Sequence, residues 1–128
     1  MLPRVSRSSL IAVVDDDISV RESVESLLKS VGFRVNTYSS AEEFMNSPRL
    51  TFAECLILDV RLEGMSGPDL QRELKTAGHS IPIVFVTAHE TEALRERMMT
   101  DGAIDCLLKP FTDDTLLGAV ERALTSRG

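Results

Sequence analysis

Short apolar runs alternate along the chain with segments in which apolar residues recur every three or four positions. Each run is about as long as a strand, and several are almost entirely apolar, as strands covered on both faces are. The runs lie at Leu10–Val14, Phe33–Thr37, Cys55–Leu58, Ile83–Val86 and Ile104–Leu108. This alternation predicts an α/β fold in which helices cover both faces of a five-stranded parallel sheet, giving a three-layer α/β/α sandwich.

The helical segments carry recognisable start and stop signals. The first has apolar residues from Val20 to Val31 and is stopped by Gly32. The second begins after Ser40, and Glu43 three residues later predicts a capping box. The remaining three helical patterns include Leu70–Ala77, Leu94–Met98 and the segment after Thr112.

The chain has neither internal repeats nor low-complexity segments, and its 128 residues suffice for one hydrophobic core. We expect a single domain at residues 10–125. Residues 1–9 are predicted to be a flexible leader, and residues 126–128 to be a tail or the start of a linker.

Charged or hydroxyl side chains follow four of the five predicted strands. In open α/β sheets the carboxyl ends of the strands share one edge, where ligands bind. The polar residues that we expect to meet at that edge are Asp15, Asp16, Asp17, Asp59, Thr87 and Lys109.

These residue types suit phosphoryl chemistry. Crowded carboxylates raise one another's pKa, and a divalent cation relieves the repulsion. A small site with few oxygen ligands favours Mg²⁺, with Mn²⁺ as an alternative. A lysine and a hydroxyl can hold phosphoryl oxygens, while a carboxylate can be the nucleophile. Taken singly, the aspartate run could instead cap a helix and Lys109 could be a surface charge.

In their order and spacing, five motifs resemble the receiver domain of response regulators in two-component signalling. The resemblance implies a flavodoxin-like fold with strand order 2-1-3-4-5. The surroundings of residues 87–89 and 109–111 are similar to FixJ-type regulators, which join the receiver to a LuxR-type helix-turn-helix. The motifs are VDDD at 14–17, ILD at 57–59, MSG at 65–67, VTA at 86–88 and KPF at 109–111.

The resemblance implies that Asp59 accepts a phosphoryl group from a sensor histidine kinase. It also implies a Mg²⁺ site formed by Asp15, Asp16, Asp59 and the backbone carbonyl of Arg61. The domain would then be a switch that catalyses only its own phosphorylation and dephosphorylation. Its output would be the regulation of transcription through a domain outside this sequence.

Further residues have roles implied by the same resemblance. Thr87 and Lys109 would bind phosphoryl oxygens, and the bond between Lys109 and Pro110 would be a cis peptide. Phosphorylation would change the face formed by the fourth helix, fifth strand and fifth helix, and a homodimer would form there.

Three positions could tune the switch. Cys106 occupies the place three residues before the lysine where such domains usually carry an aromatic side chain. Glu63 stands where a proline is common, and it adds a negative charge near the site. His89 follows Thr87 by two residues and could affect hydrolysis of the phosphorylated state.

Composition and charge also bear on nucleic-acid binding, membrane association and the cellular compartment. The net charge of −6 argues against binding nucleic acid or an anionic membrane through a basic face. No apolar run approaches the ~18 residues of a membrane span. Cys55 and Cys106 lie within apolar runs, which fits a reducing compartment, and we expect the protein in the cytoplasm.

Two alternatives remain at this point. A haloacid-dehalogenase-type phosphatase also uses an aspartate nucleophile, but it places that residue after the first strand and needs a longer chain. A receiver-like interaction module that works without phosphorylation is the second, and the residues at Cys106 and Glu63 keep it open.

Overall fold

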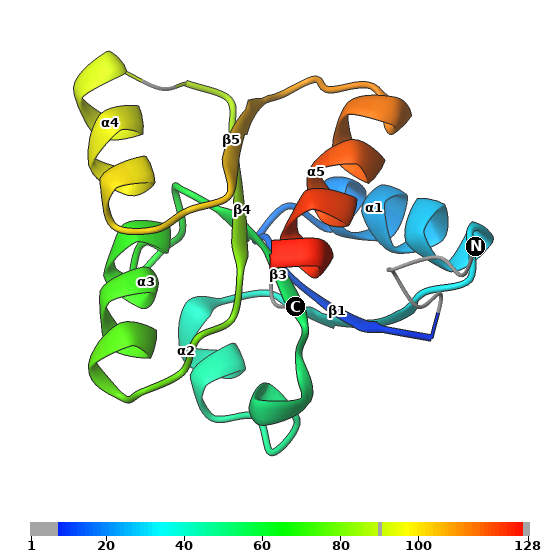
Figure 1. The fold of residues 1–128 in the computed structure, drawn as a ribbon, viewed down its shortest axis with the longest axis horizontal. Coiled ribbons are helices and arrows are strands. Elements are labelled where there is room, and N and C mark those ends of the chain that lie inside the picture. The colour runs from blue at the N-terminus through cyan, green and yellow to red at the C-terminus, as the bar shows by residue number, and fades with distance from the viewer. Residues whose placement is uncertain (1–7, 90, 127–128) are drawn as a thin grey trace.

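A computed structural model describes residues 8–89 and 91–126. Its five strands form one parallel sheet in the order β2-β1-β3-β4-β5, as predicted (Figure 1). The strands are β1 (Leu10–Val14), β2 (Arg34–Tyr38), β3 (Cys55–Asp59), β4 (Ile83–Thr87) and β5 (Asp105–Leu108). The helices are α1 (Ile18–Ser30), α2 (Ala41–Met45), α3 (Gly67–Thr76), α4 (Glu92–Thr100) and α5 (Asp113–Ser126), with a 3₁₀ turn at Leu50–Phe52.

The sheet separates two hydrophobic clusters. Helices α1 and α5 cover one face, and α2, α3 and α4 cover the other (Figure 1). Side chains of β1 alternate between them: Ala12 and Val14 pack with α2–α4, whereas Ile11 and Val13 pack with α1 and α5. Both faces are therefore buried, which is why this strand is apolar throughout.

Helix starts show where local signals succeeded and failed. Asp17 caps α1 by accepting hydrogen bonds from the N–H groups of the next turn. The capping box predicted at Ser40 is half present: its hydroxyl accepts from the Glu43 N–H, but the Glu43 carboxylate accepts from Ser39 instead, at 2.6 Å. That prediction is wrong because Glu43 Oε1 reaches one residue further back than the box requires.

The predicted leader and tail are described only in part. Of the proposed leader, residues 1–7 lie outside the described residues, as do residues 127–128 of the proposed tail. Ser9 is buried and its carbonyl accepts from the backbone of Arg34 at 3.1 Å, while the Arg34 side chain donates to Ser8. Among the described segments, no helix is long and apolar enough to cross a membrane.

The start of α3 packs tightly against the end of β3. The Gly67 N–H donates to the carbonyl of Val60 at 3.0 Å. A Cβ at Gly67 would overlap the carbonyl oxygen of Asp59 and would lie 3.0 Å from Val60 Cα and 3.1 Å from the Phe85 ring. The absence of a side chain at this position therefore allows α3 to begin directly beside the carboxyl end of β3.

We expect Gly67→Ala to lower the free energy of unfolding by about 2–3 kcal/mol, because backbone atoms must move to admit the methyl group. Gly118→Ala is the matched control in the middle of α5, where the nearest atom to a new Cβ belongs to Arg122, at 3.6 Å. That change should stabilise the protein by about 0.5–1 kcal/mol. Urea denaturation of both variants tests this, and equal stabilities would contradict the packing argument.

Candidate functional site

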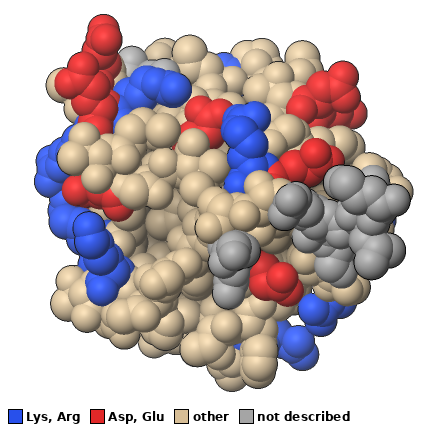
Figure 2. All heavy atoms as spheres, viewed as in Figure 1, with Lys and Arg blue, Asp and Glu red and all other residues tan. Residues whose placement is uncertain are grey.

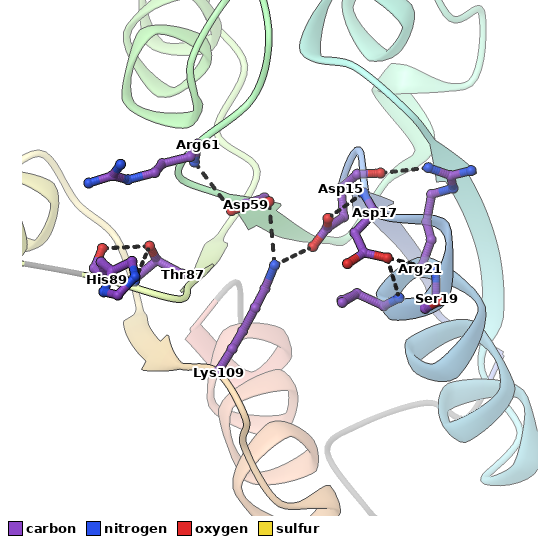
Figure 3. A network of polar contacts seen from close by, with 10 residues as sticks. Asp15, Asp17, Ser19, Arg21, Asp59, Arg61, Thr87, His89 and Lys109 are labelled. Atoms are coloured by element: carbon purple, nitrogen blue, oxygen red, sulfur yellow. Dashed lines mark hydrogen bonds and ion pairs between the residues drawn. The ribbon is translucent and has the colours of Figure 1, made fainter.

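Residues from four strands meet at the carboxyl edge of the sheet (Figure 3). Asp15 follows β1, Asp59 ends β3, Thr87 ends β4 and Lys109 follows β5. The backbone keeps these ends level, since the N–H of Lys109 donates to the carbonyl of Thr87 at 2.8 Å. Strand pairing thus brings together side chains that are up to 94 positions apart in the sequence.

One ammonium group joins two buried carboxylates. Lys109 Nζ lies 2.9 Å from Asp15 Oδ2 and 3.4 Å from Asp59 Oδ2. Asp15 and Asp59 are only 1% and 6% exposed, so neither charge is well hydrated. Buried charges need partners of opposite sign, and here a single positive charge serves two negative ones.

The three consecutive aspartates do different things. Asp15 is buried, and its second oxygen accepts from the Asp17 N–H at 2.9 Å. Asp16 is exposed, but carboxylate oxygens from Asp15, Asp16 and Asp59 lie within 4.8 Å of one another. Asp17 points to the start of α1 and caps it. The sequence predicted all three at this edge, and the structure places Asp15 and Asp16 in the carboxylate cluster.

The cluster could hold a divalent cation. Its donors are oxygens only, which suits a hard ion. Three carboxylates against one ammonium leave an excess of negative charge that a cation would neutralise. The Arg61 N–H donates to Asp59 Oδ1 at 3.2 Å, which places that backbone beside the cluster. The proposed role of the Arg61 carbonyl as a metal ligand stays a prediction.

Thr87 makes its hydrogen bonds away from the carboxylates. Its hydroxyl donates to the His89 carbonyl at 2.7 Å and accepts from the His89 N–H at 3.2 Å (Figure 3). The side chain is fully buried, whereas His89 is exposed. Sequence reasoning placed both residues here but did not foresee that they are bonded through the backbone of His89.

The other two tuning positions lie within β5 and in the β3–α3 loop. Cys106 is buried in the cluster beneath α4, and Glu63 is exposed in the loop between β3 and α3. The predicted cis peptide between Lys109 and Pro110 is present.

One residue beside the site was not predicted from the sequence. The guanidinium of Arg21 donates to the Asp15 carbonyl at 2.7 Å, a contact for which the sequence contained no pattern.

The family model for the response regulator receiver domain matches residues 11–121. The chain belongs to the response-regulator receiver family. Receivers are the phosphoryl-accepting switches of two-component systems, and this assignment favours the switch interpretation over a haloacid-dehalogenase phosphatase.

Relatives of this receiver are longer proteins. It is 43% identical to the response regulator protein TodT of Pseudomonas putida, over 92% of this chain and 52% of TodT. It is 38% identical to the transcriptional regulatory protein FixJ of Bradyrhizobium diazoefficiens, over 89% of this chain and 56% of FixJ. The structure of the response regulator StyR matches with a TM-score of 0.84 and 45% identity, covering 91% of this chain and 59% of that one. The chain thus spans about half the length of these relatives.

The charge balance of the receiver site alters its acid–base behaviour. Burial, and next the charge of Asp15, raise the pKa of Asp59 from its ordinary value of 3.8 to about 6, although Lys109 opposes the shift. Burial alone would lower the pKa of Lys109, but its hydrogen bonds and charge interactions with the two aspartates raise it above 10.5. Ionisation of Asp59 is thus less favourable here than for an aspartate in water, because its negative charge is buried and only partly compensated.

This raised pKa predicts a pH-dependent stability in the presence of a chelator. Between pH 4 and 6 the folded protein binds more protons than the unfolded chain, so stability falls as pH rises through about 6. The loss attributable to Asp59 should reach about 2–3 kcal/mol by pH 7.5. Asp59→Asn removes this titration and should be the more stable protein at neutral pH.

Urea unfolding from pH 4.5 to 7.5, with and without Asp59→Asn, measures this difference. The gap between the two proteins should widen with pH and shrink again when Mg²⁺ replaces the chelator. Parallel stability curves for the two proteins would contradict the raised pKa.

Proposed function

We propose that Asp59 is the phosphoryl acceptor of this receiver. The observation that carries the proposal is the arrangement of Lys109 Nζ between Asp15 and Asp59 in a buried cluster with excess negative charge. An acceptor needs an ionised oxygen that is held in place but not fully neutralised, and Asp59 is such a group.

The carboxylates of Asp15, Asp16 and Asp59, with the carbonyl of Arg61, would hold Mg²⁺. When bound, Mg²⁺ would offset the negative charge of the carboxylates and of the incoming phosphoryl oxygens. These residues fit that ion because they offer oxygen donors and an uncompensated charge.

The proposed reaction is an in-line transfer. An oxygen of Asp59 attacks phosphorus on the phosphohistidine of a sensor kinase, a P–O bond forms, the P–N bond breaks and the imidazole leaves. Lys109 is near enough to transfer its contact from the Asp59 carboxylate to a phosphoryl oxygen. Water later attacks phosphorus and breaks the P–O bond, which restores the carboxylate and releases phosphate. The domain thus catalyses both its own phosphorylation and its own dephosphorylation.

We propose that Thr87 connects the site to the surface. To bind a phosphoryl oxygen, its hydroxyl must give up the bond to the His89 carbonyl, and the β4–α4 loop then loses that restraint. Cys106 is small and buried beneath α4, and it stands where receivers usually carry the aromatic side chain that moves during switching. That aromatic movement therefore has no side chain to carry it here. We therefore propose that the change reaches α4 through the backbone of His89.

The output face that we propose combines α4, β5 and α5. Asp105 contacts Arg122 at 2.5 Å and Arg95 at 3.5 Å, and Arg95 also donates to the Cys106 carbonyl at 2.8 Å. Leu108, half exposed on the same edge strand, is available to a partner. We propose that a phosphorylated homodimer forms through this face and regulates transcription through a domain outside this sequence; the relative FixJ is named a transcriptional regulatory protein.

The negative net charge of this segment argues against direct binding of nucleic acid. Figure 2 shows one face of the molecule, on which basic side chains are interspersed with acidic ones among the described residues. With a net charge of −6, phosphate contacts would be opposed by the rest of the surface. The expected absence of nucleic-acid binding stays a prediction.

Phosphorylation can be measured by intact mass after incubation with phosphoramidate or acetyl phosphate. We expect the wild-type protein to gain one phosphoryl group in the presence of Mg²⁺. Most of this gain should be absent when a chelator replaces Mg²⁺ and in the Asp59→Asn variant. It should also be mostly absent in Lys109→Ala, because transfer is slower there. Asp69→Asn, in the capping box of α3, is a control outside the cluster. No gain with any donor would favour a module that works without phosphorylation.

The proposed dimer can be tested by light scattering with size-exclusion chromatography. The phosphorylated protein should approach twice the monomer mass, and Leu108→Lys should prevent this without preventing phosphorylation. Phe52→Lys is a matched control, because Phe52 is 67% exposed but lies in the 3₁₀ turn before β3. A monomer at high concentration after full phosphorylation would contradict the dimer.

A further inference from the structure

The loop between β3 and α3 is held by a residue outside the site. This loop, residues 60–66, begins beside Asp59 and contains Arg61 and Glu63. Glu42, in the first turn of α2, accepts a hydrogen bond from the Met65 N–H to its Oε2 at 2.8 Å. The two residues are 23 positions apart, so the contact ties the loop to a helix that precedes β3.

The contact involves an ionised carboxylate. The Met65 N–H, together with the N–H of Glu42 itself, lowers the pKa of the Glu42 carboxyl. Hydrogen bonds to a charged acceptor are stronger than those between neutral groups. The exposed Glu42 carboxylate thus stays ionised while its Oε2 accepts a hydrogen bond from the loop backbone.

A glycine in the loop leaves room for this carboxylate. Gly64 has a φ of +76°, which favours glycine, and a Cβ there would lie only 2.5 Å from Glu42 Oε2. A side chain at Gly64 would therefore both strain the backbone and displace the carboxylate. Two neighbouring positions, Gly64 and Met65, thus each favour the approach of Glu42.

The rest of the loop links this contact to the acceptor. The Gly67 N–H donates to the Val60 carbonyl and so joins the two ends of the loop, and at the β3 end the Arg61 N–H donates to Asp59 Oδ1 at 3.2 Å. Near the α3 end the Glu42 carboxylate holds Met65. A loop released at Met65 gains freedom close to the backbone group that orients the Asp59 carboxylate.

We propose that Glu42 is a positioning residue for the phosphoryl-acceptor site. It holds the β3–α3 loop so that the backbone at Arg61 stays in place beside Asp59. This rests on the proposed function for the meaning of the site, but the loop restraint itself is independent of phosphorylation. Glu42 touches neither substrate nor reacting atoms, and it acts through Met65.

The restraint is tested first by amide hydrogen exchange of Met65, measured by NMR on the whole chain without phosphodonor. Glu42→Ala should speed exchange at Met65 about tenfold, because the acceptor is lost. Glu43→Ala is the matched control: it removes an equal charge from the same helical turn, but its partner is Ser39. Glu42→Gln keeps an acceptor and should restore part of the protection. Unchanged exchange in Glu42→Ala would overturn the proposal.

The consequence for the site is measured as Mg²⁺ affinity by calorimetry. Glu42→Ala should raise the dissociation constant about threefold to tenfold, whereas Glu43→Ala should leave it within twofold of the wild type. Faster exchange at Met65 with unchanged Mg²⁺ affinity would overturn the positioning role. Lower Mg²⁺ affinity in a protein that accepts no phosphoryl group from any donor would support the positioning role and contradict the proposed function.

A double-mutant cycle separates a direct contact from general loosening. Gly64→Ala should weaken Mg²⁺ binding in the wild type, where its Cβ crowds the carboxylate. In Glu42→Ala the carboxylate is gone, so the same change should weaken binding by a smaller factor. Equal factors in both backgrounds would contradict a contact between Glu42 and the loop.

Discussion

The structure of the site depends on one lysine that neutralises two buried aspartates across the sheet edge. Lys109 follows β5, yet it reaches Asp15 after β1 and Asp59 at the end of β3, so its side chain extends past the end of β4. The contact exists only if all four strands are aligned. It also leaves the cluster negative, since one cation cannot neutralise Asp15, Asp16 and Asp59 together. A divalent cation would offset this excess of negative charge and would also be needed to offset the negative charge of an incoming phosphoryl group.

The position of the cluster follows from the burial of the sheet. Helices cover both faces, so the interior strand positions carry apolar side chains that offer no chemistry. Polar groups can converge only where the strands end. The tight start of α3 at Gly67 and the cap of α1 at Asp17 then bring two helices close to that edge without filling it.

Much of this arrangement could be predicted from the sequence, because strand runs, helix stops and strand-end aspartates are local patterns. The strand order came from family resemblance, since periodicity gives elements but no neighbours. Other features could not be found locally. The Met65 N–H donates to Glu42 across 23 positions of the sequence, so only the tertiary structure brings these groups together. The Thr87 hydroxyl bonds to His89 only two positions away, but no sequence pattern specified that side-chain direction. The half-formed box at Ser40 shows that even a local motif fails when its carboxylate finds another donor.

The separation of the two hydrophobic clusters gives the domain a sidedness. Cys106 and Met98 belong to the layer of α2, α3 and α4, whereas α1 and α5 pack on the opposite face of the sheet. Successive strand residues point alternately into the two layers, so the side chains of each layer pack mainly with one another. A change of side-chain volume in the α2–α4 cluster should therefore be felt first on that face of the sheet, because the α1–α5 cluster packs on the other face.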